Sequence, residues 1–137
     1  MTDRTSPESF PAAFERTLRL SPFARRLVSA RPALAAGLAS GGAAPIARAV
    51  LQAAIAEVPA GDPAALAQAL RELRARVMLT LIHRDLAGLA SLDEVVATVT
   101  SLADVAIGAR VVRFLRSPVA SGRIVRLVLR DGMAWPA

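Results

Sequence analysis

The sequence predicts an all-α bundle of about five or six helices, followed by a short C-terminal orphan strand or a disordered tail. Of the 137 residues, 54% are hydrophobic but only 4% are aromatic, and alanine supplies much of the apolar content. Alanine-rich helices pack closely, which favours a helical bundle over a sheet. Apolar residues also recur at three- and four-residue spacing along most of the chain. We expect residues 1–8 to be disordered, 9–116 to form one helical domain, and 117–137 to form a basic tail.

Three short helices are expected first, and proline marks two of their starts. Residues 9–20 place Phe10, Phe14 and Leu18 at four-residue spacing, as along one helix face. Ser21-Pro22 is a cap followed by proline at the first helical position, and it begins a helix that continues through Ala30. Arg31-Pro32 interrupts that helix and starts a short third one, which ends at the glycines after Ser40.

Residues 45–58 predict a further amphipathic helix that begins at Pro45. The residues that we expect to face inward are Ile46, Val50, Ile55 and Val58. Pro59 and Gly61 then stop the helix before the next cap.

The most strongly patterned helix starts at Asp62, a good N-cap, with Pro63 at the first helical position. Its apolar stripe comprises Leu66, Leu70, Leu73, Val77 and Leu81. Glu72 and Arg76 lie on the other side and are spaced for an i,i+4 ion pair. Residues 77–82 are apolar all round, so we place this helix at the centre of the fold.

A tight corner at residues 86–91 joins this helix to the next. Gly88 can adopt the left-handed conformation that ends a helix. Ser91 and Glu94 form a Ser-x-x-Glu capping box that starts the following helix. The residues that we expect this helix to bury are Leu92, Val95, Val96, Val99, Leu102, Ala103 and Ala106.

The chain changes character beyond Gly108. Arg110, Arg113 and Arg116 lie on one face of a helix that ends at Ser117-Pro118. Residues 123–130 then have the β-branched and leucine content of a strand, although a lone strand is not a stable unit.

Residues in the corner and its flanking helices match a known family. They are Arg74, Met78, Leu79, Ile82, residues 84–94 (RDLAGLASLDE) and residues 101–104 (SLAD). Residues 21–40, with their Ser-Pro opening, match an earlier segment in the right order. Over most of residues 21–107 the chain resembles the N-terminal region of the glutamine synthetase adenylyltransferase/adenylyl-removing enzymes. His83 departs from the pattern, because the family commonly has a large aromatic residue there, often tryptophan.

The resemblance implies part of an enzyme that attaches AMP to glutamine synthetase and removes it, using ATP and Mg²⁺. In that family a strand leads into Gly-Met-Gly-x-Leu-Gly-Gly, and a later Ser-Asp-x-Asp supplies the carboxylates that hold the metal. Here Gly132-Met133 stands where the glycine motif would open, and the remaining glycines and the carboxylate motif are missing. We therefore expect a fragment truncated before the nucleotidyltransferase motif, with 117–137 either a tail or the first strand of that domain. We assign it no catalytic, cofactor-binding or metal-binding residues and expect it to be inactive alone, with glutamine synthetase as the partner of the full-length enzyme.

Catalytic interpretations of the residues around His83 fail. Residues 83–86 match the opening of a protein-kinase catalytic loop, but the required asparagine is Ala90 and the chain has no lysine. With no cysteine or second histidine as a zinc co-ligand, His83 is expected to be a buried or half-buried helix residue. His83 and Asp85 point to different sides of a helix, which argues against a Ser-His-Asp triad. We expect Arg84 and Asp85 to form a buried or interfacial ion pair that fixes the corner.

Two other functions remain open. Residues 110–137 hold six of the 17 arginines against one acidic residue, so the chain could be an independent helical module whose basic tail binds acidic partners or nucleic acid. Without interleaved aromatic residues to stack on bases, we do not expect nucleic-acid binding. The high apolar content is also compatible with a homodimer, and the sequence does not determine the oligomeric state. The absence of cysteine, of a signal-peptide layout and of an apolar run of about 18 residues predicts a cytoplasmic protein without membrane contact.

Overall fold

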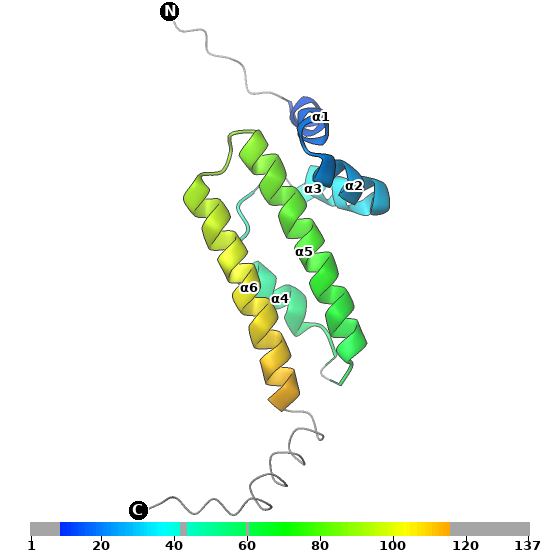
Figure 1. The fold of residues 1–137 in the computed structure, drawn as a ribbon, viewed down its shortest axis with the longest axis vertical. Coiled ribbons are helices and arrows are strands. Elements are labelled where there is room, and N and C mark those ends of the chain that lie inside the picture. Colours follow the sequence, from blue (N-terminus) through cyan, green and yellow to red (C-terminus); the bar gives the residue numbers. More distant parts are fainter. Residues whose placement is uncertain (1–8, 42–43, 60, 116–137) are drawn as a thin grey trace, which may run out of the picture.

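The computed structural model describes residues 9–41, 44–59 and 61–115, and these ranges form six α-helices and no strand (Figure 1). The helices are α1 (Phe10–Leu20), α2 (Pro22–Ala30), α3 (Ala33–Gly41), α4 (Arg48–Ala56), α5 (Pro63–Leu86) and α6 (Leu92–Leu115). The predicted all-α class is therefore confirmed. The expected disordered N-terminus, Arg116 and the expected strand at 123–130 lie outside the described residues.

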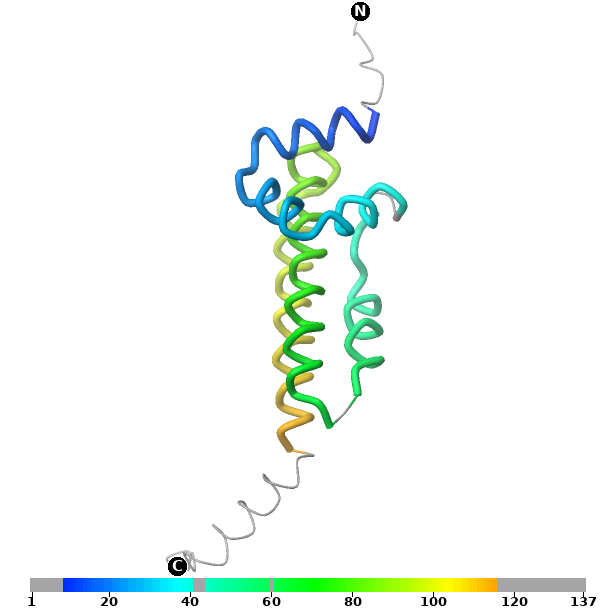
Figure 2. Tube along the Cα trace, turned by 90° about the vertical axis from the view of Figure 1, so that its right-hand side faces the viewer, coloured from blue at the N-terminus to red at the C-terminus, as the bar shows by residue number. Residues whose placement is uncertain are grey.

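The two longest helices, α5 and α6, have 24 residues each and run antiparallel as a helical hairpin (Figure 1). The three helices α1 to α3 gather around the half of α5 that leads into the corner. The shorter α4 lies along the other half (Figure 2). Helices α3 and α4 are on the same side of the hairpin, and no described helix covers the opposite side (Figure 2). The hairpin is thus covered on one face and bare on the other.

Side-chain caps start two of the helices where they were expected. The Asp62 carboxylate accepts hydrogen bonds from the backbone N–H groups of Ala64 and Ala65, both at 2.9 Å. The Ser21 hydroxyl accepts one from the N–H of Ala24 at 3.1 Å. In contrast, α4 begins at Arg48 and not at Pro45 as predicted, and its N-cap residue makes no side-chain cap hydrogen bond. Ile46 precedes the helix and packs on the core from there, which accounts for the later start.

The core is divided into two clusters along α5. The larger cluster comprises Leu51, Ile55, Leu66, Leu73, Val77, Leu81 and Val105. The smaller one comprises Ala24, Leu38 and Leu79, with α1 side chains packed on it. Helix α5 contributes to both clusters, so its predicted place at the centre is confirmed. Glu72 accepts a hydrogen bond from Gln68 and does not form the expected pair with Arg76 in the described structure.

Two predictions of inward-facing residues are wrong. In α4, Val50 is 52% exposed and its neighbour Leu51 is fully buried. In α6, Leu92, Val96, Val99 and Ala103 are exposed, and the buried residues are Thr98 and Val105. Both helices carry apolar residues on more than one face, so periodicity does not determine which face meets the core. The position of α4 determines it, because α4 packs on the Thr98 and Val105 side of α6.

Helix α6 is also long and apolar enough to span a membrane by length and composition. Three of its charged side chains nevertheless bond to other helices of the bundle, which ties α6 to α4 and α5. Glu94 accepts hydrogen bonds from Arg84 in α5, Asp104 pairs with Arg48 in α4, and Arg113 donates to the backbone at the end of α4. One helix of this kind is weak evidence for a membrane span, and 17% of its apolar window is buried inside the bundle.

The corner between α5 and α6 depends on Gly88, which adopts a left-handed φ of 71° as predicted. We expect Gly88→Ala to lower the free energy of unfolding by about 1–2 kcal/mol, the cost of left-handed backbone for a residue with a Cβ. The added Cβ would meet no atom within 4 Å, so backbone strain is the sole term. Urea denaturation of the purified chain measures the change.

Gly108→Ala is the matched control, because this glycine lies inside α6 and its added Cβ also meets nothing within 4 Å. There alanine should raise the free energy of unfolding by up to about 1 kcal/mol through better helix propensity. Effects of the same sign at both glycines would contradict this explanation of the corner.

Candidate functional site

A buried arginine and a partly buried carboxylate meet at the corner between α5 and α6. Arg84 is only 5% exposed and binds Glu94 through two hydrogen bonds, Nε to Oε1 at 2.8 Å and Nη2 to Oε2 at 3.0 Å. Its Nη2 also donates to the carbonyl of Leu89 at 2.7 Å. One guanidinium thus holds the end of α5, the connecting loop and the first turn of α6 together.

The expected ion pair between Arg84 and Asp85 does not form, and this prediction is wrong. Adjacent residues project from different sides of a helix, and Asp85 is exposed while Arg84 is buried. The capping box is also only half formed. The Ser91 hydroxyl accepts from the N–H of Glu94 at 3.2 Å, but the Glu94 carboxylate binds Arg84 and is not available to cap the helix.

Helix α1 packs against the end of α5 at the corner. Arg16 Nη2 donates to the carbonyl of Leu86 at 3.0 Å. His83 is 1% exposed, and its Nδ1 lies 3.0 Å from the hydroxyl oxygen of Thr17. The rings of Phe10 and Phe14 pack edge-on to the imidazole, with centroids 5.2 and 5.9 Å away. The expected burial of His83 is confirmed, and it occupies an aromatic site that suits the large ring expected there.

The polar side chains of this corner stabilise the fold. His83 has almost no access to solvent, and the Arg84 guanidinium is engaged by a carboxylate and a carbonyl. Within residues 9–41, 44–59 and 61–115, no three His, Cys, Asp or Glu side chains gather as a metal site would require. The corner therefore fixes the angle between α5 and α6, and the His83 and Arg84 side chains are bonded inside the fold.

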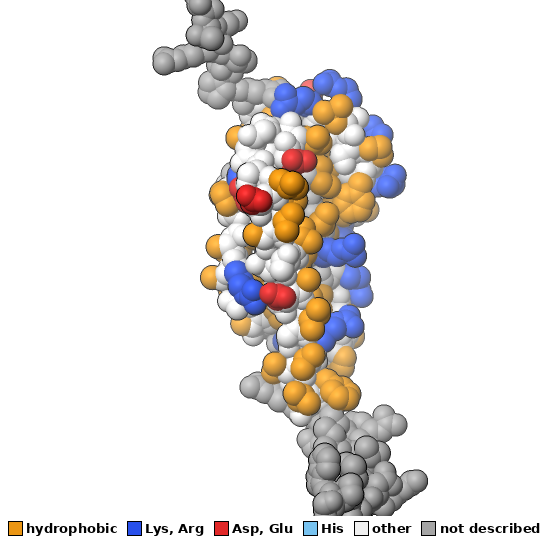
Figure 3. Space-filling view, turned by 60° about the vertical axis from the view of Figure 1, so that its left-hand side comes forward, with side chains coloured by type: hydrophobic (Ala, Val, Ile, Leu, Met, Phe, Trp, Pro, Cys, Tyr) orange, Lys and Arg blue, Asp and Glu red, His pale blue; other side chains and the backbone are white. Residues whose placement is uncertain are grey.

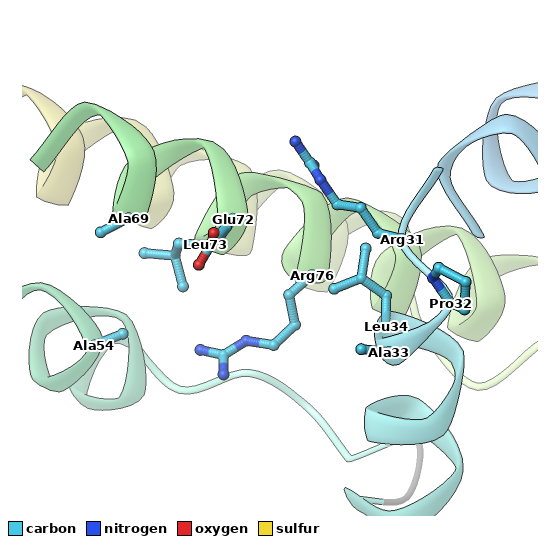
Figure 4. A pocket seen from close by; sticks show the side chains of 9 residues that line it. All are labelled: Arg31, Pro32, Ala33, Leu34, Ala54, Ala69, Glu72, Leu73 and Arg76. Carbon is cyan, nitrogen blue, oxygen red and sulfur yellow. The ribbon is translucent and has the colours of Figure 1, made fainter. Parts of the chain in front are cut away.

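A hollow of about 630 Å³ lies where α4 and α5 meet the turn between α2 and α3. Leu34 and Leu73 form its apolar floor, and Arg31 and Arg76 stand at its edges (Figure 4). The two guanidinium groups point in different directions and do not converge on one point (Figure 4). A small anionic ligand needs convergent polar groups, so this hollow does not form a binding site of that kind.

A second groove, of about 520 Å³, lies on the bare face between α5 and α6. Apolar side chains such as Met78 and Val99 line it, together with three arginines, Arg71, Arg74 and Arg110. Hydrophobic periodicity did not predict this surface, because it placed Val99 in the core, whereas Val99 is 41% exposed. The spacing of Arg71 and Arg74 with Met78 along one face of α5 was the available signal.

The expected arginine patch of the last helix is divided. Arg110 lines the groove. Arg113 instead donates from Nη2 to the carbonyls of Ile55 and Val58, at 3.3 and 2.7 Å, and so closes the C-terminal end of α4. At least one of these arginines therefore serves the fold.

Fold and site together define an all-helical segment organised by an internal ion pair at a helix corner. The family model described as glutamate-ammonia ligase adenylyltransferase matches residues 13–126. This match covers most of the sequence, and the chain belongs to that family.

Among the chain's relatives are bifunctional glutamine synthetase adenylyltransferase/adenylyl-removing enzymes. The one from Bordetella pertussis is 45% identical over 101 residues, which is 69% of this chain and 11% of the relative. The one from Burkholderia mallei is 44% identical over 96 residues, 66% of this chain and 10% of the relative. The Nitrosomonas eutropha enzyme is 63% identical over 46 residues, 34% of this chain and 5% of the relative. The chain thus spans about a tenth of the length of its first relatives. No solved structure matches the chain.

Proposed function

We propose that this chain is a noncatalytic helical scaffold of the enzyme that adenylylates and deadenylylates glutamine synthetase. Family membership supports the activity of the whole enzyme. The observation that carries the scaffold role is the bonding of the corner, whose residues also bear the family resemblance. Arg84 and Glu94 are engaged with each other and not directed at a ligand.

In this proposal glutamine synthetase is the protein substrate of the whole enzyme. ATP and Mg²⁺ serve the AMP transfer, and they bind residues outside this chain. The enzyme acts in the cytoplasm, where its protein substrate glutamine synthetase is located. The alternative of an independent basic module is weakened because Arg113 bonds to backbone carbonyls inside the fold.

The test measures AMP transfer to glutamine synthetase, and its removal, in the presence of ATP and Mg²⁺. We expect no turnover by the isolated chain, because its sequence lacks the Ser-Asp-x-Asp motif whose carboxylates hold the metal in this family. We expect the Bordetella pertussis relative, with its 101 matching residues removed, to regain activity when this chain is added. Turnover by the isolated chain would refute the noncatalytic role, and failure of the chain to restore any activity would refute the scaffold role.

A further inference from the structure

We propose that the bare face of the α5/α6 hairpin binds an amphipathic helix whose apolar stripe is flanked by carboxylates, supplied by the rest of the enzyme. This inference rests on the proposed function, because it names the surface through which the scaffold docks. The docking face consists of the groove between α5 and α6 and the exposed apolar stripe of α6.

The groove is mostly apolar and runs between residues 67–78 of α5 and 99–110 of α6. Its apolar lining residues are Ala67, Leu70, Met78, Val99, Leu102, Ala103 and Ala106. Small residues on α6 leave space between the two helices, and the larger side chains of α5 form one wall. A concave channel between two parallel ridges fits the cylinder of a third helix.

The stripe of α6 extends the groove in both directions. Its large apolar residues are between 41% and 77% exposed, and they are Leu92, Val96, Val99, Ile107, Val111 and Phe114. Figure 3 shows hydrophobic side chains running along the length of the molecule, with basic side chains along one edge. Scattered exposed apolar residues are ordinary on a protein surface, but a contiguous row of this length marks an interaction site.

The positive charge of the docking face favours a partner helix that carries carboxylates. Arg71, Arg74 and Arg110 line the groove, and no acidic residue does. Arg71 donates one hydrogen bond to the Gln68 side chain at 2.7 Å, which leaves other N–H donors of its guanidinium outward. Carboxylates beside the apolar stripe of the incoming helix would complement these arginines.

The dimensions of the face favour a helix over a lipid bilayer. The groove is lined by residues 67–78 of α5 and 99–110 of α6, which is about 18 Å of each helix, so a partner helix of about 12 residues would cover it. To span a bilayer, α6 would have to break the bonds that Glu94, Asp104 and Arg113 make to the rest of the bundle. The Bordetella pertussis relative has nearly nine-tenths of its length outside the match, which is ample sequence to supply such a helix.

The test measures binding of the full 137-residue chain to the Bordetella pertussis relative with the 101 matching residues removed, by isothermal calorimetry at two salt concentrations. Val99→Glu should raise the dissociation constant at least about tenfold by placing a charge in the groove. Val50→Glu is its control, since Val50 is similarly exposed, 52% against 41%, but lies on α4. Arg74→Glu should weaken binding about tenfold and reduce its salt dependence, whereas Arg76→Glu, on another face of α5, should not.

Equal effects of the groove and control variants would overturn the docking face while leaving the scaffold role intact. Absence of any binding would overturn both proposals. Two other occupants are tested separately. Light scattering detects a second copy of the chain, and flotation with anionic phosphatidylserine vesicles detects binding to a membrane. A dimer, or vesicle binding, that Val99→Glu abolishes would overturn the proposal in favour of a second copy or a membrane.

If the shortened relative does not fold, thermal unfolding of a full-length chimera carrying this chain's residues replaces calorimetry. There Val99→Glu must lower Tm more than Val50→Glu does.

Discussion

Arg84→Ala is expected to lower the free energy of unfolding by about 3 kcal/mol, the lower end for removal of one partner from a buried ion pair. Glu94 would lose both of its bonds from Arg84 and remain a partly buried carboxylate, since its side chain is only 25% exposed. The carbonyl of Leu89 would lose a donor as well. Urea denaturation followed by circular dichroism measures the loss.

Arg48→Ala is the matched control, because Arg48 also pairs with a carboxylate, Asp104 at 2.9 Å. Both side chains of that pair are about half exposed, so its loss should cost between 0 and about 1 kcal/mol. Arg84→Lys should restore only part of the stability, because an ammonium does not reproduce the two-pronged contact with Glu94. Equal losses for Arg84→Ala and Arg48→Ala would show that the corner pair does not hold the hairpin.

Leu51→Ala is expected to lower the free energy of unfolding by about 2–5 kcal/mol, through lost transfer energy and the cavity that remains. Leu51 is fully buried, and it belongs to the cluster that joins α4 to α5 and α6. Since α4 has only nine residues, its packing depends strongly on this side chain and on Ile55.

Val50→Ala tests the same helix at the position that periodicity assigned to the core. Val50 is 52% exposed, so its truncation should change the free energy of unfolding by less than about 1 kcal/mol. A larger loss at Val50 than at Leu51 would mean that α4 meets the bundle through its other face. Chemical denaturation of both variants decides between the two orientations.

The sequence by itself determined the elements whose causes are local. Asp62 and Ser21 begin helices through bonds that span two or three residues, and both caps are present. The left-handed corner at Gly88 follows from the backbone freedom of a single residue. The apolar run at residues 77–82 required burial on every side, so α5 could be placed at the centre without knowing its neighbours.

Only the tertiary structure decided which partners these elements meet. Arg84 had a carboxylate beside it in the sequence, but α6 brings Glu94 within 2.8 Å across the corner, while Asp85 points away. Helix α6 has apolar residues on several faces, and the position of α4 selected the side with Thr98 and Val105 for burial. The exposed apolar stripe of α6 results from that selection. Periodicity reports how many apolar faces a helix has, whereas burial depends on contacts between residues far apart in the chain.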